Sequence, residues 1–190
     1  MSEPVYYLCP YRFSADPRAM IKFYETLGLV TEVGTESETF AILRGHGGRI
    51  GVHDIDTAAD ASTVSTEMCF ETPDADTAAA HCRRLGLDAT VVDEAYGRHV
   101  DVRHGDRFVT VNEEMSDFYG YRQRREDAHP TAEVVAVWFC HDFDAEAQWY
   151  ANFGFRSDDH DNHWRELRSA SPAGTIGLHA IDDQAPATSQ

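Results

Sequence analysis

The sequence has little positive charge. It contains 16 lysines and arginines against 33 aspartates and glutamates, which gives a net charge of −17 at pH 7, and Lys22 is the sole lysine. Proteins that bind nucleic acids present a cationic face that displaces counterions from the phosphates. We therefore expect no nucleic-acid partner. An acidic surface of this kind instead attracts small cations.

Long hydrophobic runs and cysteine motifs are also missing. The longest apolar run, 134–140, has seven residues, far short of the roughly 20 that span a bilayer. The N-terminal residues show neither the basic nor the apolar part of a secretory signal. The four cysteines form no CxxC pair, which is typical of free thiols in a reducing compartment. These absences predict a cytoplasmic protein with no membrane partner.

What the sequence does contain is a spacing that occurs three times. An aspartate precedes a glycine by twelve residues in each case. The pairs are Asp16 and Gly28, Asp74 and Gly86, and Asp142 and Gly154. An aspartate accepts hydrogen bonds from the first free amides of a helix, and a glycine supplies the left-handed residue that ends it. Each interval therefore predicts a helix.

Strand-like runs flank each predicted helix. One apolar run precedes each helix, over 5–13, 67–72 and 134–140, and shorter alternating runs follow it. The first and third units end alike, with GRIGVHDID at 48–56 and GTIGLHAID at 174–182. The pattern predicts a repeated unit of one strand, one helix and two or three further strands. Because one small sheet cannot bury its helix-free face alone, the units should pair.

This unit resembles the βαβββ module of the vicinal oxygen chelate superfamily, which includes glyoxalase, bleomycin-resistance and extradiol dioxygenase proteins. The residues that carry the resemblance are Asp16 with Phe23-Tyr24 and Gly28, Thr72-Pro73-Asp74 with Arg83 and Gly86, Tyr96-Gly97-Arg98, and Asp142 with Trp149-Tyr150 and Phe153-Gly154-Phe155. The resemblance implies an α+β fold of repeated βαβββ modules, two of them paired around a central cavity, with a third C-terminal module. The implied boundaries are 1–115 for the paired modules, 116–132 for a linker, 133–182 for the third module and 183–190 for a flexible tail.

The resemblance also implies four metal-ligand positions, on the first and last strands of the paired modules. They fall on Cys9 (or on Leu8, if one residue is inserted), Gly51, Glu67 and Val109. Glu67 is the one residue of this set suited to a hard metal, and a catalytic ion normally has about three protein ligands. We therefore expect no metal cofactor. The alternative is a rearranged Fe, Zn, Ni or Mn site formed by His53, Glu67 and His99.

Strand alternation predicts the lining of the cavity, because side chains two residues apart share a face. The candidate catalytic residues are Glu67, His99 and Asp101, since a carboxylate beside an imidazole can fix its tautomer for proton transfer. The candidate ligand-binding residues are Tyr11, Arg49, His53, Cys69, Glu71, Arg103 and Val109. Alternating charges on a strand are most often a solvated face, and both interpretations stay open here.

Two classes of function are consistent with these features. The first is a metal-free protein, resembling bleomycin-resistance proteins, that binds a small cationic or aromatic molecule. The alternative is a glyoxalase- or dioxygenase-type lyase, isomerase or oxygenase, either with the rearranged metal site or as an acid–base enzyme using Glu67 and His99. A single third module leaves its concave sheet exposed, which predicts a two-fold homodimer.

Overall fold

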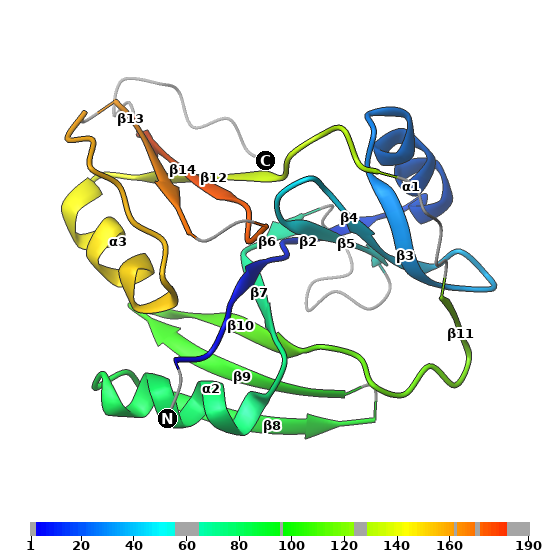
Figure 1. Ribbon diagram of the computed structural model, residues 1–190, viewed down its shortest axis with the longest axis horizontal. Coiled ribbons are helices and arrows are strands. Elements are labelled where there is room, and N and C mark those ends of the chain that lie inside the picture. Colours follow the sequence, from blue (N-terminus) through cyan, green and yellow to red (C-terminus); the bar gives the residue numbers. More distant parts are fainter. Residues whose placement is uncertain are drawn as a thin grey trace.

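The computed structural model is a mixed α+β structure with three helices and three sheets in its described part (Figure 1). The structure describes residues 3–55, 65–95, 97–123, 129–161, 163–169 and 172–181. The predicted tail at 183–190 lies outside them. Within those ranges, no helix has the length and apolar character that crossing a membrane requires.

The first sheet has six strands in the order β11-β3-β4-β5-β2-β6. Their bounds are Tyr11–Ser14 (β2), Val30–Thr35 (β3), Phe40–Arg44 (β4), Arg49–Asp54 (β5), Thr66–Glu67 (β6) and Tyr121–Gln123 (β11). Helix α1, Pro17–Thr26, follows β2 and packs on one face of the sheet, which presents the buried Ile50 and Val52. The alternate residues of β5, including Arg49, therefore face away from α1.

The second sheet has five strands in the order β1-β7-β10-β9-β8. Their bounds are Tyr7–Leu8 (β1), Cys69–Thr72 (β7), Ala89–Glu94 (β8), Gly97–His104 (β9) and Arg107–Glu113 (β10). Helix α2, Ala75–Arg84, follows β7 and contacts β8, β9 and β10. The face of β7 that carries Glu71 is opposite to the face that carries the core residue Phe70.

The third sheet is smaller, with the order β12-β14-β13. Its elements are β12 (Val135–Cys140), α3 (Phe143–Tyr150), a short 3₁₀ turn (Ala151–Phe153), β13 (Trp164–Arg168) and β14 (Thr175–Ala180). The strand before each helix runs parallel to the last strand that follows it, as β2 does to β5, β7 to β10 and β12 to β14. The three sheets thus share one topological plan.

Two chain segments join the first sheet to the second. Strands β1 and β2 form one segment, and β6 and β7 form the other. The segments run antiparallel, with Tyr7 opposite Glu71 in the second sheet and Tyr11 opposite Glu67 in the first. The backbone N–H of Cys9 donates to the carbonyl of Cys69 at 3.0 Å between these two pairs. These pairs and this hydrogen bond hold the first two sheets together.

The predicted helix starts are confirmed. The carboxylates of Asp16, Asp74 and Asp142 accept the amides of residues 19, 77 and 145, at 2.9, 2.6 and 2.9 Å. The glycines that follow the helices have left-handed backbone, with φ of 101°, 82° and 84°. At the first of these, Gly28, a side chain would also meet the hydroxyl of Thr131.

Replacement of Asp16 by alanine should lower the free energy of unfolding by about 1 kcal/mol, because the first turn of α1 loses its capping acceptor. Urea unfolding of both proteins measures the difference. Asp16→Asn keeps an acceptor oxygen and should lose less. Equal losses in the two variants would show that the carboxylate charge, and not the hydrogen bond, is what stabilises α1.

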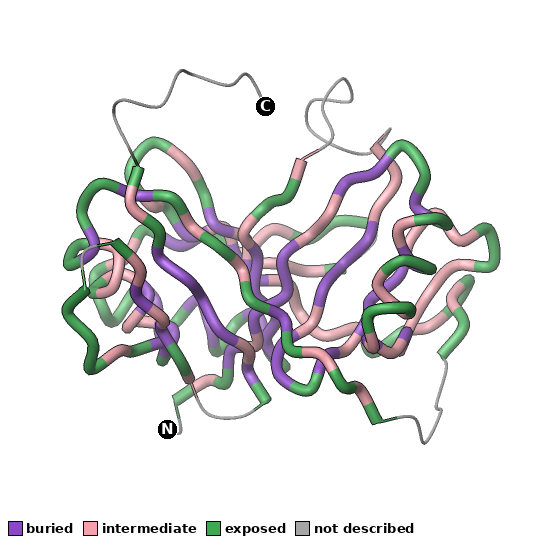
Figure 2. The backbone as a smooth tube through the Cα atoms, turned by 90° about the horizontal axis from the view of Figure 1, so that it is seen from above, coloured by how far each residue is buried: buried purple, intermediate pink, exposed green. Residues whose placement is uncertain are grey.

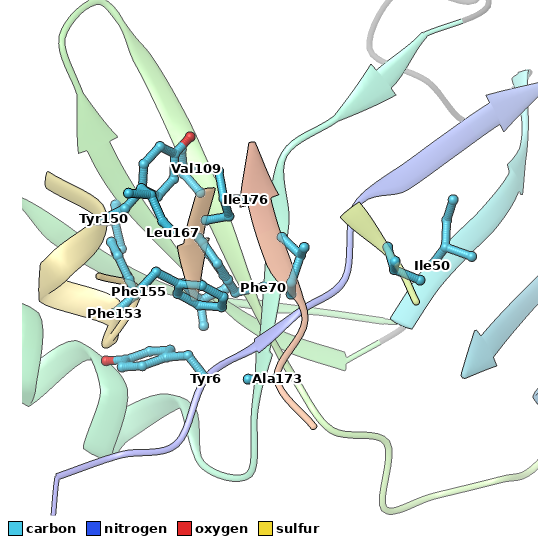
Figure 3. Close-up of a cluster of buried hydrophobic side chains, with 14 of the residues drawn as sticks. Tyr6, Ile50, Phe70, Val109, Tyr150, Phe153, Phe155, Leu167, Ala173 and Ile176 are labelled. Carbon is cyan, nitrogen blue, oxygen red and sulfur yellow. The ribbon is translucent and has the colours of Figure 1, made fainter. Parts of the chain in front are cut away.

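The second and third sheets share a core (Figure 3). Phe70 is fully buried and stacks on Phe153, with ring centroids 5.0 Å apart and planes at 9°. Phe155 and Tyr150 lie 5.5 and 6.3 Å from the same ring. Figure 2 shows buried backbone concentrated along the strands in the middle of the molecule. The third sheet is therefore attached through its helix-bearing side, and not through its open face.

Part of the segment predicted to be a linker, 116–132, is ordered against the first sheet. The chain leaves β10, runs past residues 114–120 and forms β11, which pairs with β3. The Arg122 guanidinium donates to Glu36 at 2.7 and 3.0 Å, and the Tyr121 ring lies 5.8 Å from Phe40. The chain thus crosses from the second sheet to the far edge of the first.

Candidate functional site

A cavity of about 370 Å³ lies where the helix-free sides of the first two sheets meet. The first sheet contributes side chains from β3, β4 and β5, the second contributes Glu71, and the segment after β10 supplies the rest. The lining residues are Glu32, Val33, Ile42, Arg44, Arg49, Glu71, Glu114, Met115, Phe118 and Gln123. We call the charged part of this lining, formed by Glu32, Arg44, Arg49, Glu71 and Glu114, the floor of the cavity; most of the other lining side chains are apolar.

The Arg49 side chain is the centre of the charged floor. One guanidinium nitrogen, Nη1, donates to Glu71 and to Glu114, at 2.7 Å in each case. Its Nε lies 3.4 Å from Glu32, which also accepts a hydrogen bond from Arg44 Nε at 2.6 Å. Three carboxylates thus surround two guanidinium groups. The cluster carries a formal excess of one negative charge when all five groups are ionised.

Burial and charge oppose each other in this cluster. Burial alone would lower the pKa of Arg49. The carboxylates of Glu71, Glu114 and Glu32 raise it by more than burial lowers it, so the guanidinium stays charged. Burial raises the pKa of Glu71 above its usual value, and Arg49 works against that rise. Arg49 therefore makes the ionised form of a nearly inaccessible carboxylate tolerable.

The four predicted metal positions do not fit a divalent ion. A Cβ at Gly51 would lie 2.8 Å from the Tyr11 ring, so that ring already fills the position where the second ligand was expected. Burial, followed by the neighbouring Glu71 carboxylate, raises the pKa of Cys9 well above its usual value and keeps it a thiol, which is the wrong form for a ligand. The donor set therefore disagrees with the metal centre that the resemblance implies.

Val109 requires a correction. It was expected to line the cavity as the fourth position, but it pairs with Val102 and is 2% exposed within the core. Figure 3 places it near Tyr150, on the side of the second sheet that faces the helices. The residues of β10 on the cavity side are its neighbours Phe108 and Thr110.

The alternative metal set is not brought together either. His53 packs between the rings of Phe13 and Phe40, at centroid distances of 5.8 and 5.3 Å, and burial lowers its pKa. Among the residues that the structure describes, no three His, Cys, Asp or Glu side chains gather closely enough to hold an ion. The prediction that His53, Glu67 and His99 form a metal site is therefore wrong for the described residues, because the three side chains lie apart.

The candidate catalytic residues share a side of the sheets but do not line the cavity. His99 Nε2 and Asp101 Oδ1 are 3.6 Å apart, and Thr110 donates to the same Asp101 oxygen at 3.3 Å. Glu67 faces the same way as its partner Tyr11, with a pKa raised by burial. The expected carboxylate–imidazole neighbours thus exist, without a direct hydrogen bond.

The remaining predicted residues differ in accessibility. Cys69 is buried, and burial together with Glu67 raises its pKa. Arg103 lies 4.5 Å above the Phe108 ring and 3.4 Å from Asp88, away from the cavity lining. Burial raises the pKa of Tyr11, whose ring lies 6.3 Å from the Phe40 ring. Arg49 and Glu71 are therefore the predicted ligand-binding residues that line the cavity.

Sequence reasoning missed most of the lining. Arg44 and Ile42 pair with Arg49 and Gly51 across the β4–β5 ladder, so strand parity applied to β4 would have found them. Glu32 lies at a register shift between Thr31 and Val33, where simple alternation fails. Residues 114–123 show no periodic pattern, and from residue 116 onward they were predicted to be a linker.

The comparisons with known proteins concern structure alone, because no family model and no curated protein matches the sequence. A variant of 4-hydroxymandelate synthase from Streptomyces coelicolor superposes with a TM-score of 0.58 at 16% identity, covering 98% of this chain and 65% of that one. A fusion protein described as xylose isomerase-like TIM barrel/4-hydroxyphenylpyruvate dioxygenase gives 0.56 at 14%, covering 96% and 32%. A hypothetical protein from Staphylococcus aureus gives 0.55 at 6%, covering 94% and 87%.

These similarities define the class of fold. The chain shares its fold with the 4-hydroxymandelate synthase variant and with the dioxygenase fusion protein, and both similarities fit the resemblance found in the sequence. It is similar over nearly its whole length to the synthase and to the dioxygenase fusion, of which it spans about two thirds and about one third. At such low identity the likeness establishes the fold and leaves the chemistry to the site.

Proposed function

We propose that the chain is a metal-free binding protein for a small organic cation with an aromatic part, held between two paired βαβββ modules. The observation that carries this proposal is the Arg49 cluster, in which a guanidinium group sits among three carboxylates on the cavity floor. The two guanidinium groups offset two of the three carboxylates, so the formal excess of one negative charge suits a monovalent organic cation better than a divalent metal.

The charge and shape of the cavity support a cationic ligand. The carboxylates of Glu32 and Glu114 are each about one-third exposed, so a cation entering the cavity can reach them. Phe118 and Met115 offer apolar surface for a ring. A volume of about 370 Å³ is at the lower end of the range for small-molecule sites. The net charge of −17 would draw cations toward the protein at low ionic strength.

Calorimetric titration with para-aminobenzamidine, an aromatic amidinium, tests the proposal. We expect binding of this cation and at least tenfold weaker binding of para-aminobenzamide, its neutral analogue, because a hydrogen bond between charged groups contributes about 1.5 to 3 kcal/mol. Glu114→Gln should weaken binding of the amidinium about tenfold for the same reason. Glu94→Gln, which removes the same charge at an exposed position outside the cavity, should leave it unchanged.

Two outcomes would contradict the proposal. Equal affinity for the two probes, or no binding of either, would reject a cation-selective cavity. Stoichiometric iron, zinc, nickel or manganese in the purified protein would reject the metal-free part and restore the lyase, isomerase or oxygenase alternative.

A further inference from the structure

One face of β12 is apolar and exposed. Val135, Val137 and Phe139 point from it and are 43, 44 and 56% exposed. The register continues this face across the sheet, from Phe139 to His179 on β14 and then to Trp164 on β13. The Trp164 ring covers Gly177, where a Cβ would lie 2.3 Å from the ring. The open face of the third sheet is therefore apolar along β12 and aromatic at Trp164, with the ion pair of Glu166 and Arg168 beside them on β13.

The outer edge of β12 is also accessible. In the described part of the chain, β12 pairs with β14 alone. A groove of about 460 Å³ runs beside its other edge, between residues 132–138 and a wall that includes Tyr24, Leu27 and Met68. An edge strand with free backbone groups is a template for another strand. Proteins commonly protect such edges with charges or proline, and the sequence of β12, VAVWFC, contains neither.

The same molecule shows how such a strand is completed. The first two sheets are joined by antiparallel pairing of the strands that precede their helices, at Tyr7 opposite Glu71 and Tyr11 opposite Glu67. Strand β12 has the equivalent place, since it precedes α3 and runs parallel to β14. The equivalent antiparallel partner is missing from the described residues.

We propose that a second copy of this chain supplies that partner, with β12 pairing antiparallel to its own equivalent across a two-fold axis at Val137. In this register Val135 of each copy lies opposite Phe139 of the other, so these exposed apolar side chains pack side by side across the new strand pair. A second copy can pair in this register although each chain carries −17, because β12 is uncharged and the two glutamates that line the groove, Glu67 and Glu133, lie outside the paired residues 135–139. This pairing would join the third sheets of the two copies. It repeats the way in which the β1–β7 and β2–β6 pairs join the first and second sheets of one copy.

Sedimentation velocity at micromolar concentration tests the interface. We expect a dimer for the native chain. Val137→Glu should raise the dissociation constant at least about hundredfold, because the two introduced carboxylates would face each other across the axis. Phe139→Glu should raise it at least about tenfold, because each introduced carboxylate would lie opposite the apolar Val135 of the other copy. Phe108→Glu is the matched control: Phe108 is also a strand residue, 50% exposed, and its replacement should leave the dimer intact.

A cross-link locates the axis. Val137→Cys should form a disulfide between two copies in oxidised glutathione, because the two thiols would face each other there, whereas Phe108→Cys should not. A monomeric native chain, a dimer that resists both glutamate substitutions, or no cross-link at Val137 would each overturn the proposal. Circular dichroism of every variant checks that it has folded. The cavity plays no part in this interface, so the outcome is separate from that of the amidinium titration.

Discussion

Replacement of Arg49 by methionine should lower the free energy of unfolding by about 3 kcal/mol at neutral pH. The substitution leaves Glu71 buried and ionised beside Glu114 and Glu32, with no guanidinium to balance them. Removing one partner of a buried ion pair costs about 3 to 5 kcal/mol, and the lower end applies because about a quarter of the Arg49 side chain is exposed. Urea unfolding at fixed ionic strength measures the loss.

The pH dependence of this variant identifies the cause. The pKa of Glu71 is already raised by burial and should rise further without Arg49. The folded state then binds the proton more tightly than the unfolded chain, so the free energy of unfolding increases as the pH falls through this pKa. The deficit of Arg49→Met should therefore shrink on acidification. The double variant Arg49→Met with Glu71→Gln removes both charges and should recover most of the stability at neutral pH. A deficit that is independent of pH would point to lost packing against Tyr7, which lies 4.9 Å below the guanidinium.

Replacement of Phe70 by alanine should have an effect of similar or greater size, about 4 kcal/mol, within the range of 3 to 5 for a buried phenylalanine. Phe70 has no exposed surface, and its ring contacts three aromatic rings that belong to the third unit (Figure 3). The cavity left behind cannot close without moving the third sheet. Thermal and urea unfolding both measure the change.

Phe108→Ala is the control, because it removes the same ring from a position that is not buried. Phe108 is half exposed, so its loss should cost about 0.5 kcal/mol or less. If Phe70→Ala produces two separate unfolding transitions, the third sheet unfolds independently once this contact is lost. A loss below about 1 kcal/mol for Phe70→Ala would show that the shared core between the second and third sheets contributes little to stability.

Local features of the chain were predictable because their causes are local. The position of each helix follows from an aspartate that caps it and a glycine that ends it, and neither depends on distant residues. The orientation of Arg49 and Glu71 follows from strand alternation, which needs nothing beyond knowing which neighbours are buried. The charged floor of the cavity was therefore partly predictable.

The failures have non-local or irregular causes. The side of the sheet reached by Val109 depends on a count from the preceding turn, and an error of one residue moves every side chain of a strand to the other face. Glu32 enters the cavity because of a register shift in β3. Glu114 lines the cavity because the segment after β10 crosses to the first sheet, and no sequence pattern in that segment predicts this path. Two of the three carboxylates around Arg49, those of Glu32 and Glu114, are thus positioned by irregular backbone.

The path from β10 to β11 has a consequence for how molecules reach the cavity. Residues 114–123 form one wall, yet β11 holds to β3 through three residue pairs and an exposed ion pair between Arg122 and Glu36. Short, solvent-exposed pairing of this sort opens at far lower free energy than the core strands. For the ligand proposed above, we expect detachment of β11 alone to open this wall, so that the rate of ligand exchange depends on a few hydrogen bonds at the sheet edge while Phe70 and its neighbours stay packed.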